Sequence, residues 1–153
     1  MKENTSVEIL NDLIRINNDR IEGYEKAEKE LKDEDADLKS IFTRMKGESK
    51  NYVIELTTMV REQGGEPATG ATGAGKLYRT WMDLKATFSG KDRHAILSSC
   101  EYGEDAAQRA YEMALSNETL SPDITHSIRA QKAALKTSHD EIKRFRDTTK
   151  VTH

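Results

Sequence analysis

The residues of this chain that could do chemistry are acidic side chains and one histidine on sequence stretches with helical periodicity. Facing helices build di-metal sites from inward Glu residues and Glu-x-x-His pairs, with iron or manganese as candidate ions. Glu104 and His139 point inward on a helical wheel, while Glu25, Glu48 and Glu101 lie on the flanks and Glu22 points outward. Counting about 1.5 Å per residue places all of these except Glu25 within roughly one turn of a common level. The candidate metal ligands are therefore Glu22, Glu25, Glu48, Glu101, Glu104 and His139.

The same residues also fit a structural hydrogen-bond network. A buried charge must be paired or shift its pKa, and Glu104 and His139 could satisfy each other or nearby polar side chains. Neither of the two segments expected to face them, 35–64 and 121–148, carries Glu-x-x-His at this level. We therefore favour the structural network and keep the metal site as the alternative. The polar neighbours that could take part are Asn17, Arg20, Tyr24, Tyr52 and Gln131.

These side chains must be positioned by helices, because the chain has 35% hydrophobic and 33% charged residues and only two prolines. Apolar residues recur at helical spacing, which predicts an all-α four-helix bundle in one domain, 1–153. Thr5 with Glu8 predicts the first helix start, Gly64 follows the second helix, and Ser121 before Pro122 predicts the start of the last. The expected helices are about 5–32, 35–64, 91–117 and 121–148, with a short helix at 76–88 in the connection. Two short-looped hairpins joined by one long crossover are expected.

Charge and hydropathy exclude several classes of function. The net charge of −3 with interspersed signs offers no basic stripe for phosphate contacts, so nucleic acid is not an expected partner. No run approaches the roughly 20 apolar residues that cross a bilayer, and the first residues lack a signal-peptide pattern. A cytoplasmic protein with no membrane partner is expected. The single cysteine, Cys100, lies on an apolar helix face and is interpreted as a small core residue.

Several longer strings resemble an uncharacterised bacterial family of ferritin-like, rubrerythrin-related four-helix-bundle domains whose function is unknown. The resemblance covers about 7–147 and implies the ferritin-like topology and a cytoplasmic bacterial protein. The strings that carry it are LNDLIRINNDRIEGYEKA, GGEP, LYRTWMDLK, CEYGEDAAQRAYEMAL and SHDEIKRFRD.

The resemblance also implies a ligand pattern that this chain keeps only in part. Ferritin-like iron proteins place one Glu on each of helices one and three and Glu-x-x-His on helices two and four. Glu22 or Glu25 and Glu101 or Glu104 could fill the first two roles. Glu48 and Glu55 have no His three residues on, and Lys136 stands where a Glu should precede His139. These departures argue against ferroxidase or peroxidase activity.

The leading hypothesis is a non-enzymatic, stress-related ferritin-like bundle in which Glu104 and His139 belong to a buried polar layer, a degenerate metal site. The alternative is a di-iron or other metal-binding oxidase or iron-handling protein. A second alternative is an interaction module that forms a homodimer through its helix faces.

Overall fold

The computed structural model describes residues 5–70 and 93–149. In this part of the chain there are four long helices and one 3₁₀ turn, and there is no strand. The predicted short helix at 76–88 lies outside the described residues. The elements are α1 (Thr5–Glu30), η1 (Asp33–Asp35), α2 (Ala36–Glu62), α4 (Arg93–Leu115) and α5 (Pro122–Thr148).

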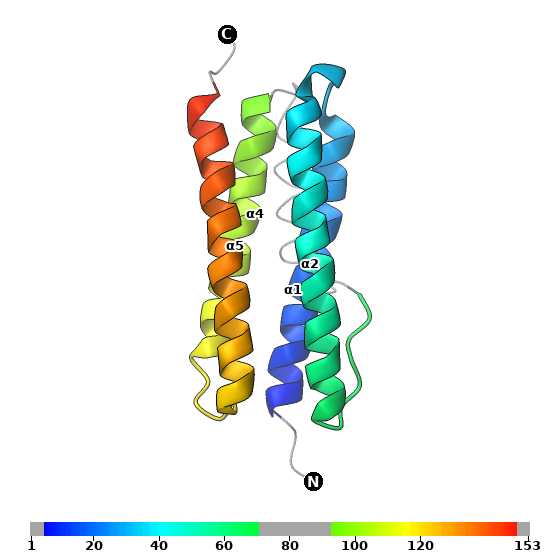
Figure 1. Ribbon diagram of the computed structural model, residues 1–153, viewed down its shortest axis with the longest axis vertical. Helices are drawn as coiled ribbons and strands as arrows, with labels where there is room; N and C mark the ends of the chain where they lie inside the picture. The colour runs from blue at the N-terminus through cyan, green and yellow to red at the C-terminus, as the bar shows by residue number, and fades with distance from the viewer. Residues whose placement is uncertain (1–4, 71–92, 150–153) are drawn as a thin grey trace.

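The four helices form an elongated bundle of two antiparallel hairpins. In Figure 1, α1 and α5 run in one direction along the long axis and α2 and α4 run in the other. The end of α2 and the start of α4 lie at opposite ends of the bundle. The helices α1 and α4 also pack against each other, and α2 contacts α5 more sparsely. This is the predicted bundle with one long crossover.

Local chemistry sets the helix ends within one or two residues of the predicted positions. The first helix ends at Glu30 rather than at 32, because η1 follows, where the Lys32 amide donates to Asp35 Oδ2 at 3.0 Å. The second ends at Glu62, where the Gly64 and Gly65 amides cap the carbonyls of Arg61 and Val60 at 2.9 and 3.0 Å. This double cap is a Schellman motif, and its Gly64 has φ +79°.

The end of α2 packs closely against α1, and the start of α5 has the predicted capping residues. A Cβ on Gly65 would lie 2.6 Å from Val7 on α1, so glycine there lets the end of α2 approach α1 closely. The last helix has Ser121 as its N-cap, whose side chain accepts from the Ile124 amide at 3.3 Å, and Pro122 begins the first turn.

The apolar core has two halves separated by a layer of buried polar side chains. The first apolar cluster contains Leu13 of α1 and Leu56 of α2, and the second contains Phe42 of α2 and Cys100 of α4. Between them along the helices lie four side chains that we call the polar layer: Asn17, Arg20, Ser49 and Glu104. Burial of both clusters supplies most of the favourable free energy of folding. No described helix has an apolar stretch long enough to span a membrane.

The start of α4 is tied to the start of α2 by ion pairs that should make stability depend on acid pH. Hydrogen bonds from Arg93, at 2.9 and 2.6 Å, lower the pKa of Asp37 to about 2. A carboxylate with a depressed pKa stabilises the fold above its unfolded pKa, near 3.8, and loses this effect as the pH falls towards 2. Because 54% of the Asp37 side chain is exposed, the pair should contribute at most about 1 kcal/mol.

The expected result is that Asp37→Asn lowers the free energy of unfolding at pH 7 and that the difference from wild type shrinks between pH 4 and pH 2. Urea unfolding followed by circular dichroism at several pH values measures this. The exposed neighbour Asp33 provides a control, Asp33→Asn, for loss of a negative charge at the same turn. A difference that stays constant with pH would contradict the assignment.

Candidate functional site

The centre of the polar layer is Arg20 on α1, which is only 1% exposed. Its Nε and Nη2 atoms donate to the two carboxylate oxygens of Glu104 on α4, each at 2.8 Å. The same Nη2 lies 2.9 Å from Glu48 Oε1 on α2, and Nη1 donates to Ser49 Oγ at 2.8 Å. The guanidinium therefore joins three helices through a bidentate pair with Glu104 and further polar contacts with Glu48, Ser49 and Met45.

Hydrogen bonds extend the layer to the fourth helix. Ser49 Oγ donates to Asn17 Oδ1 at 2.9 Å, and Asn17 Nδ2 donates to the Tyr111 hydroxyl at 2.8 Å. Tyr111 in turn donates to Gln131 Oε1 on α5 at 2.7 Å. A second route reaches α5 through Ser138 Oγ, which donates to Glu48 Oε1 at 2.9 Å. Buried polar networks that are satisfied in this way rigidify a core.

Electrostatics in and beside the layer keep the Arg20 guanidinium charged and the Tyr24 hydroxyl and Cys100 thiol protonated. Burial alone would lower the pKa of Arg20. The charges and hydrogen bonds of Glu104 and the other groups around the guanidinium have the larger combined effect, so its pKa is raised overall. Burial, followed by the charge of Glu104, raises the pKa of the Tyr24 hydroxyl, which donates to Glu104 Oε2 at 2.6 Å. The same two causes raise the pKa of the Cys100 thiol, which is fully buried. Cys100 therefore lacks the electropositive, accessible surroundings of a reactive thiol.

The polar layer does not fit a di-metal centre. Glu22 and Glu25 on α1 are exposed and do not reach the layer, while Glu48 and Glu104 are both bound to Arg20. A positive guanidinium between these carboxylates fills the position that a metal cation would need. The histidine predicted as a ligand, His139, lies against Asp105 and Asp140 instead.

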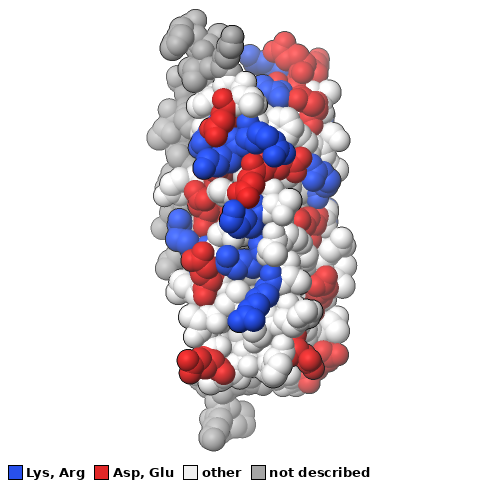
Figure 2. Space-filling view, turned by 60° about the vertical axis from the view of Figure 1, so that its left-hand side comes forward, with Lys and Arg blue, Asp and Glu red and all other residues white. Residues whose placement is uncertain are grey.

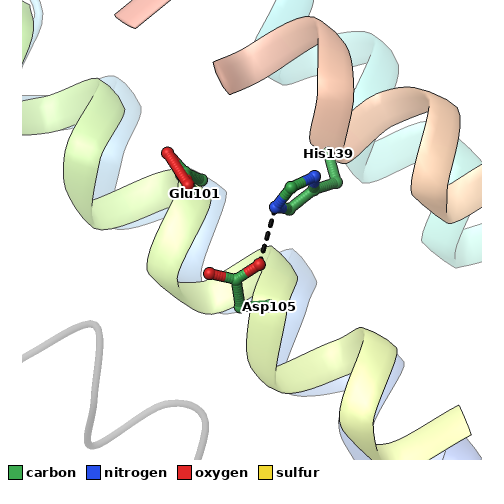
Figure 3. Close-up of side chains that lie close together, drawn as sticks. All are labelled: Glu101, Asp105 and His139. Carbon is green, nitrogen blue, oxygen red and sulfur yellow. Dashed lines mark ion pairs between the residues drawn. The ribbon is translucent and has the colours of Figure 1, made fainter. Parts of the chain in front are cut away.

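The remaining two candidates, Glu101 and His139, lie in a separate group on the α4–α5 hairpin. Glu101 and Asp105 occupy adjacent turns of α4, and His139 extends towards them from α5 (Figure 3). His139 Nε2 lies 2.6 Å from Asp105 Oδ1, and Nδ1 lies 3.0 Å from Asp140 Oδ1. Of the partners considered for Glu104 from the sequence, Arg20 and Tyr24 bind it, whereas His139 does not. The residue of α5 that reaches the polar layer is the preceding one, Ser138.

Three residues of these sites were not singled out from the sequence. Ser49 and Ser138 are small and carry no charge, so nothing but their register marks them as layer residues. Asp105 had a usable signal, since it stands four residues after Glu101 and thus on the same helix face. Arg20 was recognised only as one of several possible partners, although it follows Asn17 and precedes Tyr24 at helical spacing.

The surface over this hairpin carries both signs of charge. Figure 2 shows Lys and Arg side chains in a broken line with Asp and Glu side chains beside them. Several of the basic residues have acidic partners, including Lys136 with Asp140 at 3.0 Å and Arg146 with Glu101. The expectation that nucleic acid is not a partner stays a prediction.

Comparison with known proteins places the fold in the ferritin-like four-helix-bundle class. A structure of a mutant of Dps1 from Mycobacterium smegmatis is similar with a TM-score of 0.80 and 14% sequence identity, covering 93% of this chain and 95% of that one. At this identity the likeness defines the fold alone. A search of curated proteins gave no match.

The sequence itself shows which family the chain belongs to. Residues 5–117 match the family described as Domain of unknown function (DUF2383), which covers most of the chain. The chain belongs to this family. The resemblance stated from the sequence, to an uncharacterised ferritin-like family, is thereby confirmed.

Proposed function

We propose that this chain is a non-enzymatic ferritin-like bundle protein whose polar layer holds the Arg20 guanidinium in place of metal ions. The observation that carries the proposal is that the acids reaching inward from α2 and α4 meet on this one cation, Glu48 at 2.9 Å and Glu104 at 2.8 Å. Di-iron bundles direct a Glu from each of two helices and Glu-x-x-His pairs from the other two at their ions. In this chain the inward acids instead bind Arg20 and form part of a structural hydrogen-bond network.

The wider parts of the proposal rest on the sequence resemblance. These are a bacterial origin and a cytoplasmic location. A stress-related role is a further part of the proposal. Self-association through helix faces is the second candidate role. It is favoured by two large apolar side chains on the surface, Ile54 of α2 and Met113 of α4, which are 65% and 75% exposed.

Metal analysis of protein purified without an affinity tag or chelator tests the proposal. We expect any bound iron or manganese to be unchanged by Glu104→Gln, because Glu104 binds Arg20 rather than an ion. Elemental analysis by mass spectrometry gives the metal-to-protein ratio. The control is Glu25→Gln, which changes an exposed acid of α1, and circular dichroism verifies that each variant is folded.

Two outcomes would overturn the proposal. One is near-stoichiometric iron or manganese that is lost in Glu104→Gln and kept in Glu25→Gln. The other is oxidation of added Fe(II) that is faster with the wild-type protein than in buffer and slows in Glu104→Gln. Either result would favour the iron-handling or oxidase alternative.

A further inference from the structure

We propose that Glu101, Asp105 and His139 form a three-ligand site for a divalent transition-metal ion on the α4–α5 hairpin, separate from the polar layer. One ligand atom from each residue lies within 4.8 Å of the other two. Two of the ligands share a face of α4, and the third projects from α5 towards them (Figure 3). The site goes beyond the proposed function, because it uses no residue that binds Arg20.

The donor atoms of these three side chains are better placed to bind an ion than to hydrogen-bond to one another. Glu101 Oε2 and His139 Nε2 are both buried, and each makes an ion-pair contact, but neither has a hydrogen bond of normal geometry. A metal bound at about 2.0–2.2 Å by each atom would need these atoms about 3 Å apart. Small side-chain rotations would widen the 2.6 Å contact between Nε2 and Asp105 Oδ1 to that separation.

A carboxylate on the other side of the imidazole supports this role. Asp140 Oδ1 lies 3.0 Å from His139 Nδ1. Histidines that bind metals usually donate their second ring N–H to a carboxylate or carbonyl, which fixes the tautomer and orients the ring. In the tautomer in which Nδ1 donates to Asp140, the lone pair of Nε2 is directed towards Asp105 and Glu101.

Exposure gives the ion a route of entry. The side chains of Glu101 and His139 are 13% and 15% exposed, whereas that of Asp105 is 44% exposed. The ion would approach along Asp105 and keep water at its remaining coordination positions. Three protein ligands with an open position are typical of accessible rather than closed metal sites.

Arg146 is the competitor that the ion must displace from Glu101. The guanidinium also holds Asp147, with Nε and Nη2 at 3.0 and 2.7 Å from Oδ1. It therefore keeps a carboxylate partner when Glu101 turns to the metal. Because Arg146 places a positive charge beside the site, it weakens metal binding, and its removal should strengthen it.

One imidazole and two carboxylates select a particular class of ion. Imidazole suits zinc, iron, copper and nickel, whereas calcium and magnesium prefer sites made only of oxygen. We choose Zn²⁺ as the probe, because it accepts mixed nitrogen and oxygen ligands and has no redox chemistry. The test measures Zn²⁺ binding to the full chain.

The experiment is isothermal titration calorimetry with ZnCl₂ on untagged, chelator-stripped protein. We expect one Zn²⁺ per chain, at least about tenfold weaker binding in His139→Gln and in Asp105→Asn, and tighter binding in Arg146→Gln. Loss of a carboxylate that only orients a ligand already costs about 10- to 100-fold in affinity, so loss of a direct ligand should cost as much. The matched control is His126→Gln, which removes an exposed histidine of the same helix.

The outcomes separate this site from the polar layer. Binding that is unchanged in both His139→Gln and Asp105→Asn would overturn the site, as would no binding by wild type at millimolar Zn²⁺. Two ligand variants are used so that one remains informative if the other fails to fold. Zn²⁺ lost in Glu104→Gln but kept in His139→Gln would overturn both this inference and the proposed function. Zn²⁺ lost in His139→Gln and Asp105→Asn but kept in Glu104→Gln would support both.

Discussion

Replacing Arg20 with leucine is expected to lower the free energy of unfolding by about 3–5 kcal/mol, the largest effect of a polar substitution in this chain. Breaking one partner of a buried ion pair leaves an uncompensated charge in a low-dielectric interior. Here the loss strands Glu104, which is 1% exposed, and removes a donor from Glu48 and Ser49. Urea unfolding of Arg20→Leu at pH 7, followed by circular dichroism, measures the change.

Two further variants show whether the effect comes from the buried pair. The control Arg15→Leu removes an arginine of the same helix that is 40% exposed and pairs with Asp12, and it should cost less than about 1 kcal/mol. The double variant Arg20→Leu with Glu104→Leu should recover part of the loss, since apolar residues often replace a buried pair without penalty. Recovery should be partial, because the Tyr24 hydroxyl then loses its hydrogen bond to Glu104. An Arg20→Leu cost equal to that of Arg15→Leu would contradict the prediction.

The fold could be predicted because, in each long helix, apolar residues at helical spacing mark the face that is buried. On α4, the apolar residues Ile96, Cys100, Ala107 and Tyr111 recur at helical spacing in the sequence, and all four are buried. These positions depend only on helical periodicity, which is local. The ends were displaced by one or two residues where local hydrogen bonds intervene, as with the Lys32 amide that is held by Asp35 rather than by the helix.

The candidate site could be predicted only in part, because its partners depend on the rotation and register of separate helices. The inward direction of Glu104 follows from its own helix. Its pairing with Arg20, 84 residues earlier, requires the relative height of α1 and α4. On α5 an error of one residue is a rotation of about 100°, and this places Ser138 at the polar layer and His139 beside Asp105.

Long side chains add a second source of error. A guanidinium on a flexible stem can reach across a bundle, so the helical wheel of α1 does not say which carboxylate it will meet. Arg20 contacts two helices at once, and the sequence offered Asn17 and Tyr24 as equally plausible partners for the acid. The network therefore follows from packing of the assembled bundle rather than from any one motif.

Phe42→Ala is expected to lower the free energy of unfolding by about 3–5 kcal/mol, since it removes a large buried ring and leaves a cavity. Phe42 is fully buried in the second apolar cluster, and its ring lies 5.2 Å from that of Tyr24. Urea unfolding measures the loss. The control Ile54→Ala changes a residue of the same helix that is 65% exposed and should cost less than about 0.5 kcal/mol.

The same variant tests whether the second apolar cluster and the polar layer depend on each other. Phe42 supports the ring of Tyr24, and the Tyr24 hydroxyl donates to Glu104 at 2.6 Å. Once the Phe42 ring is gone, Tyr24 can shift and its hydrogen bond should weaken, so Tyr24→Phe should cost less in the Phe42→Ala background than in wild type. Residues in contact commonly show such coupling, of about 0.5–3 kcal/mol. Strict additivity of the two substitutions would mean that the layer is held by Arg20 without help from the packing above it.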